Sequence, residues 1–152
     1  MTEERVIKSH LGVYAFIFNE NNLLLIKKAR GPYTGEYDLP GGTIEPNELI
    51  EETLAREIKE ETSCDLLQCA QLCTLDARFD WDRKEEGKPD AVFKHIGIIY
   101  MATVKGEPSI KGDGLDSAGA EWIPISDIVE KKVVVTPFVE RGLSYISANM
   151  KE

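Results

Sequence analysis

Three glutamates that follow a glycine turn constrain this chain more than any other feature. Residues 39–66 read LPGGTIEPNELIEETLAREIKEETSCDL, and Glu57, Glu60 and Glu61 lie within about one helical turn of each other. Like charges at this spacing repel one another and weaken a helix. We therefore expect a compensating interaction here, and that interaction is the first indication of function.

A helix is predicted from about residue 48 to residue 62, because most residues there are good helix formers. At about 100° per residue, its buried stripe is formed by three apolar residues, Ile50, Leu54 and Ile58. On the same helical wheel, Glu61 falls between Ile50 and Leu54, and Glu57 lies beside it. A carboxylate at the edge of a buried face is costly unless it is paired or bound to a metal.

Two interpretations of this acidic helix are open on its geometry alone. The first is a solvated acidic face that Arg56 and Lys59 partly neutralise, which explains Glu51 and Glu52 but not Glu61. The second is a site for a hard cation, because carboxylate oxygens on one helical face suit Mg²⁺ or Mn²⁺. The preceding glycine turn favours the second, because glycine lets the backbone come close to a ligand.

The segment resembles the Nudix box. The similar positions are Gly42, then after five residues Glu48, then after seven residues Arg56-Glu57-Ile58, then after one residue Glu60-Glu61. This resemblance implies an α/β fold, namely a Nudix α/β/α sandwich with a mixed β-sheet, formed here by one domain over residues 1–152. It also implies a hydrolase that cleaves a nucleoside diphosphate linked to another moiety, usually with Mg²⁺.

The resemblance also assigns roles to the acidic residues. It implies that Glu57, Glu60 and Glu61 bind the metal, with a contribution from the backbone carbonyl of Gly42, and that Glu48 pairs with Arg56 to hold the loop against the helix. All five of these side chains belong to the predicted catalytic set. Glu57 is also one candidate for the general base. The alternatives are acids in later segments, Glu107, Glu121, Asp113 and Asp116.

The chain departs from the Nudix pattern at Ser63, where the box has glycine. A glycine there ends the helix in a left-handed conformation, in which serine costs about 1 kcal/mol. Every acidic position is kept, so we expect an effect on stability and not a loss of activity. Leu49 replaces a small capping residue, and we expect Asn47 to cap the helix instead.

Predicted substrate-binding residues lie outside the acidic helix as well. The planar guanidinium of Arg30 suits a phosphate, although a solvated strand end is the alternative. Gly41 and Gly42 bring backbone close to the ligand, and Trp81, in a charged loop, is a candidate for stacking on a base. His95 lies in an apolar strand, where a core histidine with satisfied hydrogen bonds is the favoured interpretation.

The rest of the chain predicts strands interspersed with helices. Residues 11–18 and 23–28 are expected to form a hairpin, and Ser126 is expected to cap a short helix. Thr136-Pro137 is expected to start a C-terminal helix. Four further strands are expected at residues 37–39, within 65–79, at 91–104 and at 120–123.

Composition limits the possible partners and compartment. The net charge is −9, so the chain has no general attraction for nucleic acid or anionic membranes, and we expect neither as a partner. The cysteine count is odd, the spacing fits no zinc pattern, and the N-terminus lacks an apolar signal core. We expect a cytoplasmic protein that binds a small-molecule nucleotide, with a homodimer possible.

The sequence leaves open which substrate the chain binds and whether the chain is catalytic. Some ADP-ribose-cleaving Nudix proteins carry a proline about fifteen residues beyond the box, where this chain has Phe79 and Asp80. The leading expectation is therefore a nucleoside triphosphate or a modified nucleotide such as an oxidised purine. A non-catalytic nucleotide-binding Nudix module is the main alternative, and an isomerase of prenyl diphosphates would lack a well-placed cysteine.

Overall fold

The computed structural model describes residues 6–112 and 117–149, which form two four-stranded sheets. The first sheet has the order β5-β1-β7-β6. Its strands are β1 (Val6–Phe16), β5 (Gly41–Thr43), β6 (Asp65–Trp81) and β7 (Ala91–Lys105). In the second sheet, β3 pairs with β2, β4 and β8. These strands are β2 (Phe18–Asn19), β3 (Asn22–Lys28), β4 (Tyr37–Asp38) and β8 (Ser117–Pro124).

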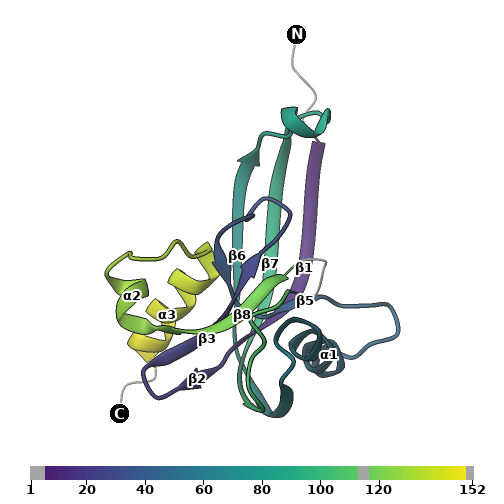
Figure 1. Ribbon diagram of the computed structural model, residues 1–152. Helices are drawn as coiled ribbons and strands as arrows, with labels where there is room; N and C mark the ends of the chain where they lie inside the picture. The colour runs from purple at the N-terminus through teal and green to yellow at the C-terminus, as the bar shows by residue number, and fades with distance from the viewer. Residues whose placement is uncertain (1–5, 113–116, 150–152) are drawn as a thin grey trace.

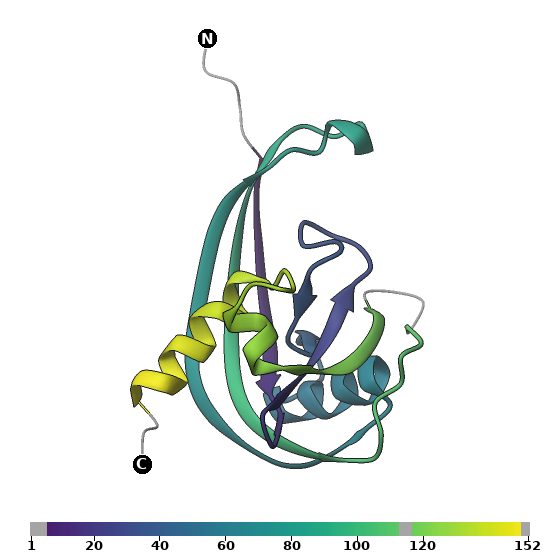
Figure 2. The same ribbon diagram turned by 60° about the vertical axis from the view of Figure 1, so that its left-hand side comes forward.

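Helices cover the sheets from two sides, as Figures 1 and 2 show. They are α1 (Ile50–Thr62), α2 (Ile125–Val129) and α3 (Pro137–Asn149), and a 3₁₀ turn, η1 (Lys84–Glu86), joins β6 to β7. In β1, Val13 and Ala15 join the core under α1, whereas Tyr14 and Phe16 join the core that contains α3. Because residues 13–16 at the end of β1 are buried on both faces, this part of the strand is continuously apolar and does not alternate.

The strand directions confirm the expected mixed α/β/α architecture. β1 pairs in parallel with β7 and antiparallel with β5, and β6 pairs antiparallel with β7. The register places His10 of β1 directly beside His95 of β7. This pairing brings the two histidines of the chain to the same place in the sheet.

The predicted hairpin between residues 11–18 and 23–28 is wrong. Residues 11–16 lie in the first sheet and pair with β7, and only Phe18 and Asn19 pair with β3. The chain passes from one sheet to the other after β1. β7, the parallel partner of β1, lies far along the sequence and leaves no local signal near β1. The turn at 19–22 therefore suggested a hairpin that includes residues 11–16, whereas the hairpin that forms is the shorter one between β2 and β3.

Helix boundaries differ from the predictions at two N-termini. α1 begins at Ile50 and not at residue 48, and Leu49, not Asn47, is the capping residue; its N–H donates to Glu52 Oε1 at 2.8 Å. α2 begins at Ile125, so Ser126 lies inside the helix and does not cap it. The helix predicted after Thr136 begins at Pro137, as expected.

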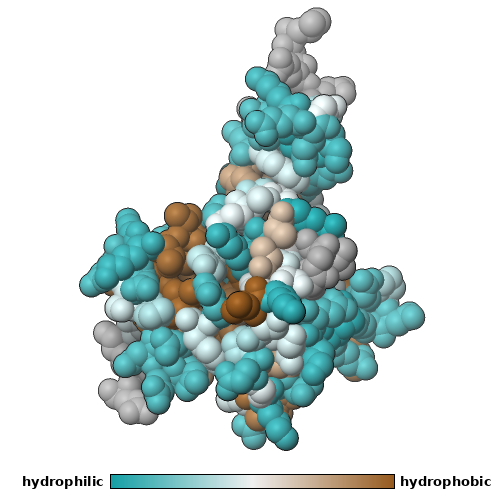
Figure 3. Space-filling model, viewed as in Figure 1, coloured by the Kyte–Doolittle hydropathy of each residue, from teal (hydrophilic) through white to brown (hydrophobic). Residues whose placement is uncertain are grey.

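One end of the first sheet projects beyond the helices. In Figures 1 and 2, the ends of β1, β6 and β7 extend away from the rest of the molecule toward η1. Ile7 and Leu11 of β1 are 72% and 49% exposed there. The tip around η1 is covered by hydrophilic residues (Figure 3). Within the described residues, no helix has the length and apolar character needed to cross a bilayer.

Candidate active site

Glu61 is a buried carboxylate at the end of α1. Glu61 is only 2% exposed, and its Oε1 accepts a hydrogen bond from the Gly41 N–H at 2.8 Å. Its Oε2 has no hydrogen-bond partner among the described residues. Burial raises the pKa of Glu61 well above its ordinary value, against the lowering effects of the Gly41 N–H and Lys28. Such a carboxylate needs a donor or a cation at its second oxygen.

The glycine turn fits closely against these acids. Gly41 has φ +148°, and a Cβ there would overlap the Val13 carbonyl oxygen. At Gly42, a Cβ would lie 2.6 Å from the carboxyl carbon of Glu57. The absence of both side chains therefore lets the turn lie directly beside Glu57 and Glu61.

Arg56 holds the preceding loop against α1, as expected from the paired positions. Its Nε donates to Glu48 Oε2 at 2.6 Å and its Nη2 to Glu48 Oε1 at 2.9 Å. Its Nη1 donates to Glu57 Oε1 at 3.1 Å and lies 3.3 Å from Glu60 Oε2. The hydrogen bonds from Arg56 lower the pKa of Glu48 to about 2. The guanidinium thus joins the loop to α1 and also screens the charges of Glu57 and Glu60.

The three expected metal ligands face two different partners in this structure. Glu57 and Glu60 face Arg56, and Glu61 faces Gly41. Among residues 6–112 and 117–149, no three acidic, histidine or cysteine side chains are arranged as a ready metal site. The chemistry nevertheless fits a hard cation, because the unpartnered Glu61 oxygen and the Glu57 carboxylate lie beside a turn without side chains.

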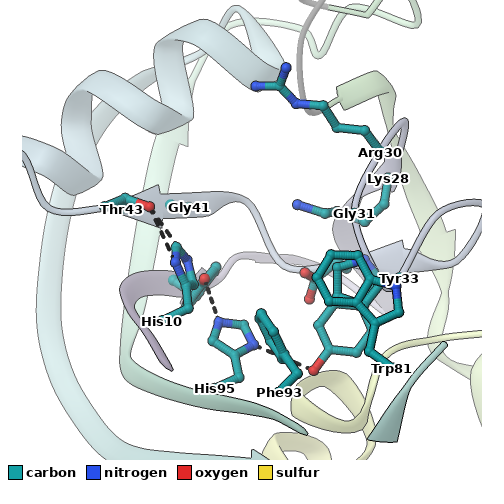
Figure 4. Close-up of a pocket in the computed structure, with 14 residues that line it drawn as sticks. His10, Lys28, Arg30, Gly31, Tyr33, Gly41, Thr43, Trp81, Phe93 and His95 are labelled. Atoms are coloured by element: carbon teal, nitrogen blue, oxygen red, sulfur yellow. Dashed lines mark hydrogen bonds between the residues drawn. The ribbon is translucent and has the colours of Figure 1, made fainter. Parts of the chain in front are cut away.

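A cavity of about 410 Å³ opens on the other side of the glycine turn (Figure 4). It is lined by all four residues predicted to bind substrate: Arg30, Gly41, Gly42 and Trp81. These residues come from the loop after β3, from β5 and from the end of β6, so the fold brings together positions that are distant in sequence. Their role in binding remains a prediction.

His95 lies on the floor of this cavity. It is 3% exposed, and its Nε2 and Nδ1 lie 2.7 Å from Tyr14 Oη and 3.4 Å from Tyr33 Oη. Burial, with smaller effects of His10 and Lys28, lowers the pKa of His95 to about 3, so the ring is neutral near pH 7. The predicted buried histidine with satisfied hydrogen bonds is confirmed, and it also forms part of the cavity wall.

Sequence reasoning missed several residues that line the cavity. The polar ones are His10, Asp38 and Thr43, and Phe93 completes the aromatic wall; Lys28, which precedes Arg30 at the end of β3 and is also a sequence-based candidate for a phosphate-binding cation, lines the cavity too. Asp38 is 2% exposed, and its Oδ1 accepts hydrogen bonds from the Thr136 hydroxyl and the Leu39 N–H. The available signal was the register of β1 against β7, which places His10 and His95 side by side. That register becomes visible only once the parallel pairing is known.

Of the alternative general bases, the two that the structure describes, Glu121 and Glu107, do not line this cavity. Glu121 of β8 accepts a hydrogen bond from the Tyr37 hydroxyl at 2.6 Å and lines a separate cavity of about 170 Å³. Glu107 is exposed in the loop after β7. Asp113 and Asp116 lie outside the described residues. Among the described candidates, Glu57 is the one that lies against the glycine turn.

The fold and this arrangement of acids agree with a family match. The family model described as NUDIX domain matches residues 8–139, so the chain belongs to the Nudix family. Its relatives carry different names. An ADP-ribose pyrophosphatase from Methanocaldococcus jannaschii is 46% identical over 118 residues, which are 78% of this chain and 63% of that protein. A nucleoside triphosphatase NudI from Escherichia coli is 47% identical over 123 residues, which are 77% of this chain and 83% of that protein.

A solved structure supports the same fold. The crystal structure of a MutT NUDIX hydrolase from Burkholderia pseudomallei has 27% identity and a TM-score of 0.58, and covers 78% of this chain and 85% of that chain. This chain spans less than two thirds of the length of the archaeal relative.

Proposed function

We propose that the chain is a Mg²⁺- or Mn²⁺-dependent hydrolase that cleaves the diphosphate linkage of a nucleoside di- or triphosphate derivative by attack of water at phosphorus. The observation that carries this proposal is the buried Glu61 carboxylate, whose second oxygen has no partner among the described residues. It lies beside a glycine turn that also lines a cavity containing Lys28 and Arg30. A carboxylate, a side-chain-free turn and two cations suit a cation-bound diphosphate.

The residues that would hold the cation are Glu57, Glu60 and Glu61, with the Gly42 carbonyl. A bound divalent cation would neutralise phosphate oxygens and lower the pKa of water. The Gly41 N–H fixes the Glu61 carboxylate in orientation, and Arg56 holds the carboxylates of Glu48 and Glu57. Hydrolysis therefore requires an ordered end of α1 that is already tied to the loop.

The remaining roles belong to the cavity. Arg30 binds a phosphate through its planar guanidinium, and Trp81 offers a face for a base. Glu57 accepts the proton of the attacking water at its carboxylate, because among the described candidate bases it is the one that lies against the turn. Its position against Gly42 leaves no side chain between that carboxylate and the turn.

A nucleoside triphosphate is the first substrate to test. The name of the relative from Escherichia coli agrees with that class, whereas the name of the archaeal relative points to ADP-ribose. The proline of some ADP-ribose-cleaving proteins is absent, since Phe79 and Asp80 occupy that place. We therefore rank nucleoside triphosphates and oxidised purine nucleotides above ADP-ribose.

The test is a panel of nucleoside triphosphates, oxidised purine nucleotides and nucleoside diphosphate derivatives, incubated with Mg²⁺ or Mn²⁺ while phosphate products are measured. We expect turnover of at least one compound. We expect Glu61→Gln to lower it at least about a hundredfold, because it removes a ligand of the cation. Glu51→Gln removes an exposed acid from the same helix and serves as the matched control.

Two results would contradict this function. Binding of nucleotides without turnover of any compound would instead support a non-catalytic binding module. Equal activity of Glu61→Gln and Glu51→Gln would show that the buried carboxylate takes no part in the reaction.

A further inference from the structure

A second cavity adjoins the first, and Trp81 lies in the wall of both. It has a volume of about 510 Å³ and shares Arg30, Gly31 and Trp81 with the first cavity. Its outer wall is the turn between β6 and β7, at the projecting end of the first sheet (Figures 1 and 2). A ligand in the first cavity can therefore extend past Trp81 into the second.

Arg83 is a buried cation in the wall of this second cavity. It is 6% exposed, its Nε donates to the Pro89 carbonyl at 2.8 Å, and its guanidinium lies 5.5 Å from the centre of the Trp81 ring. Within residues 6–112 and 117–149, Arg83 makes no ion pair, and no oxygen accepts a hydrogen bond from its Nη atoms. A buried charge is costly unless a partner of opposite charge compensates it.

The acids of the same cavity do not provide that partner. The acids near Arg83 are Asp82, Glu85 and Glu86 of the cavity and Asp90, whose Oδ1 accepts a hydrogen bond from the Arg83 backbone N–H at 3.4 Å and not from the guanidinium; all four are exposed. Exposed charges are screened by water. An anionic ligand in this cavity would therefore interact more strongly with Arg83 than with the exposed charges around it.

We propose that Arg83 binds a phosphomonoester that the substrate carries apart from its scissile diphosphate, with the rest of the substrate in the first cavity. This inference rests on the proposed function, because it assumes a nucleotide in the first cavity. The planar guanidinium offers two parallel donors to phosphate oxygens, and Trp81 holds it from one side. The phosphate belongs either to the 2′- or to the 3′-position of a ribose, and the two sources need separate tests.

A purely structural role of Arg83 predicts something different. Its Nε donates to the Pro89 carbonyl, so the side chain also holds the turn between β6 and β7 together. If this were its whole role, substitution would lower stability without changing the preference among ligands. The preference between two ligands that differ by one phosphate is therefore the decisive measurement.

The experiment measures Kd by calorimetry in metal-free buffer, where no hydrolysis occurs, for two pairs of compounds. NADPH and NADH differ by a 2′-phosphate, and coenzyme A and its dephospho form differ by a 3′-phosphate. In one pair, we expect the native chain to bind the phosphate-bearing compound at least about tenfold more tightly. Arg83→Gln should abolish that ratio, and Lys88→Gln, which removes an exposed charge from the same turn, should keep it.

The possible results separate this inference from the proposed function. A ratio near one in both pairs for the native chain, no binding of any of the four compounds, or an unchanged ratio in Arg83→Gln overturns it. Arg83→Lys, which keeps the charge, replaces Arg83→Gln if the latter does not fold, and should weaken the ratio only in part. If the native chain prefers the phosphate-bearing compound but hydrolyses no compound of the nucleotide panel, the proposed hydrolase activity is wrong and the role of Arg83 in binding stands.

Discussion

Ser63 shows how one residue departs from its family without changing the site. It ends α1 with φ +69°, in the left-handed conformation that the resemblance predicted for a glycine. Its N–H donates to the Lys59 carbonyl at 3.0 Å, so the helix ends normally despite the side chain. The cost of serine here is backbone strain, since a Cβ is unfavourable at this φ.

We expect Ser63→Gly to stabilise the protein by about 0.5–1 kcal/mol, because it removes that strain. The measurement is urea denaturation followed by circular dichroism. Ser63→Ala is the matched control and should give little gain, since alanine keeps the Cβ. An equal gain from both variants would show that the hydroxyl, and not the backbone conformation, limits stability.

At the scale of the element, α1 combines a buried stripe with clustered acids. Leu54 and Ile58 are fully buried, as the helical wheel predicted, and Glu61 is nearly as buried. Without a cation, Arg56 screens Glu57 and Glu60, while one oxygen of Glu61 has no described partner. A ligand of the folded state that meets this oxygen should stabilise the whole chain.

We predict that Mg²⁺ raises the thermal midpoint of the native chain, by an amount equivalent to about 2.7 kcal/mol when the ion is at a hundred times its Kd. Glu61→Gln should lose this increment, and Glu51→Gln should keep it. In metal-free buffer, Glu61→Gln should be at least as stable as the native chain, because a neutral amide is cheaper to bury and still accepts the Gly41 N–H. An undiminished increment in Glu61→Gln would refute the assignment of this carboxylate.

The elements show which features a sequence can predict. The core of α1, the strands β6 and β7 and the start of α3 followed from local periodicity and turn residues, because these signals act over neighbouring residues. The partner of β1 did not follow, since a parallel pairing depends on contacts between distant segments. The same reason applies to the candidate site: the resemblance to the Nudix box pointed to the acids of α1, whereas the places of His10, Asp38 and Arg83 depend on neighbours that the fold supplies.

At the scale of the molecule, His95 joins three separate parts of the fold. Its ring contacts Tyr14 of β1, Tyr33 of the loop after β3 and Phe138 of α3. All of these contacts are made by a neutral ring, whose pKa is lowered to about 3. The unfolded chain holds a proton on this histidine up to about pH 6.5. Protonation therefore favours unfolding.

The lowered pKa of His95 makes the free energy of unfolding depend on pH. The contribution of His95 to stability is complete above about pH 6.5 and is lost as the pH falls toward about 3. Between these values, His95→Asn, which does not titrate, should have a slope of unfolding free energy against pH that is smaller by up to about 1.4 kcal/mol per pH unit. Denaturant titrations at several pH values measure both slopes. Equal slopes would show that the ring is charged in the folded protein.

The projecting end of the first sheet has a consequence for how the cavities fill. Trp81 and Arg83 sit where β6 and β7 extend past the helices, while the acids sit on a helix that is fixed to the core. Strand ends without a helix over them separate from their neighbours at lower free energy than core strands do. We therefore expect the outer wall of the cavities to open locally while α1 and its acids stay in place, so that ligand entry and the proposed hydrolysis depend on different parts of the chain.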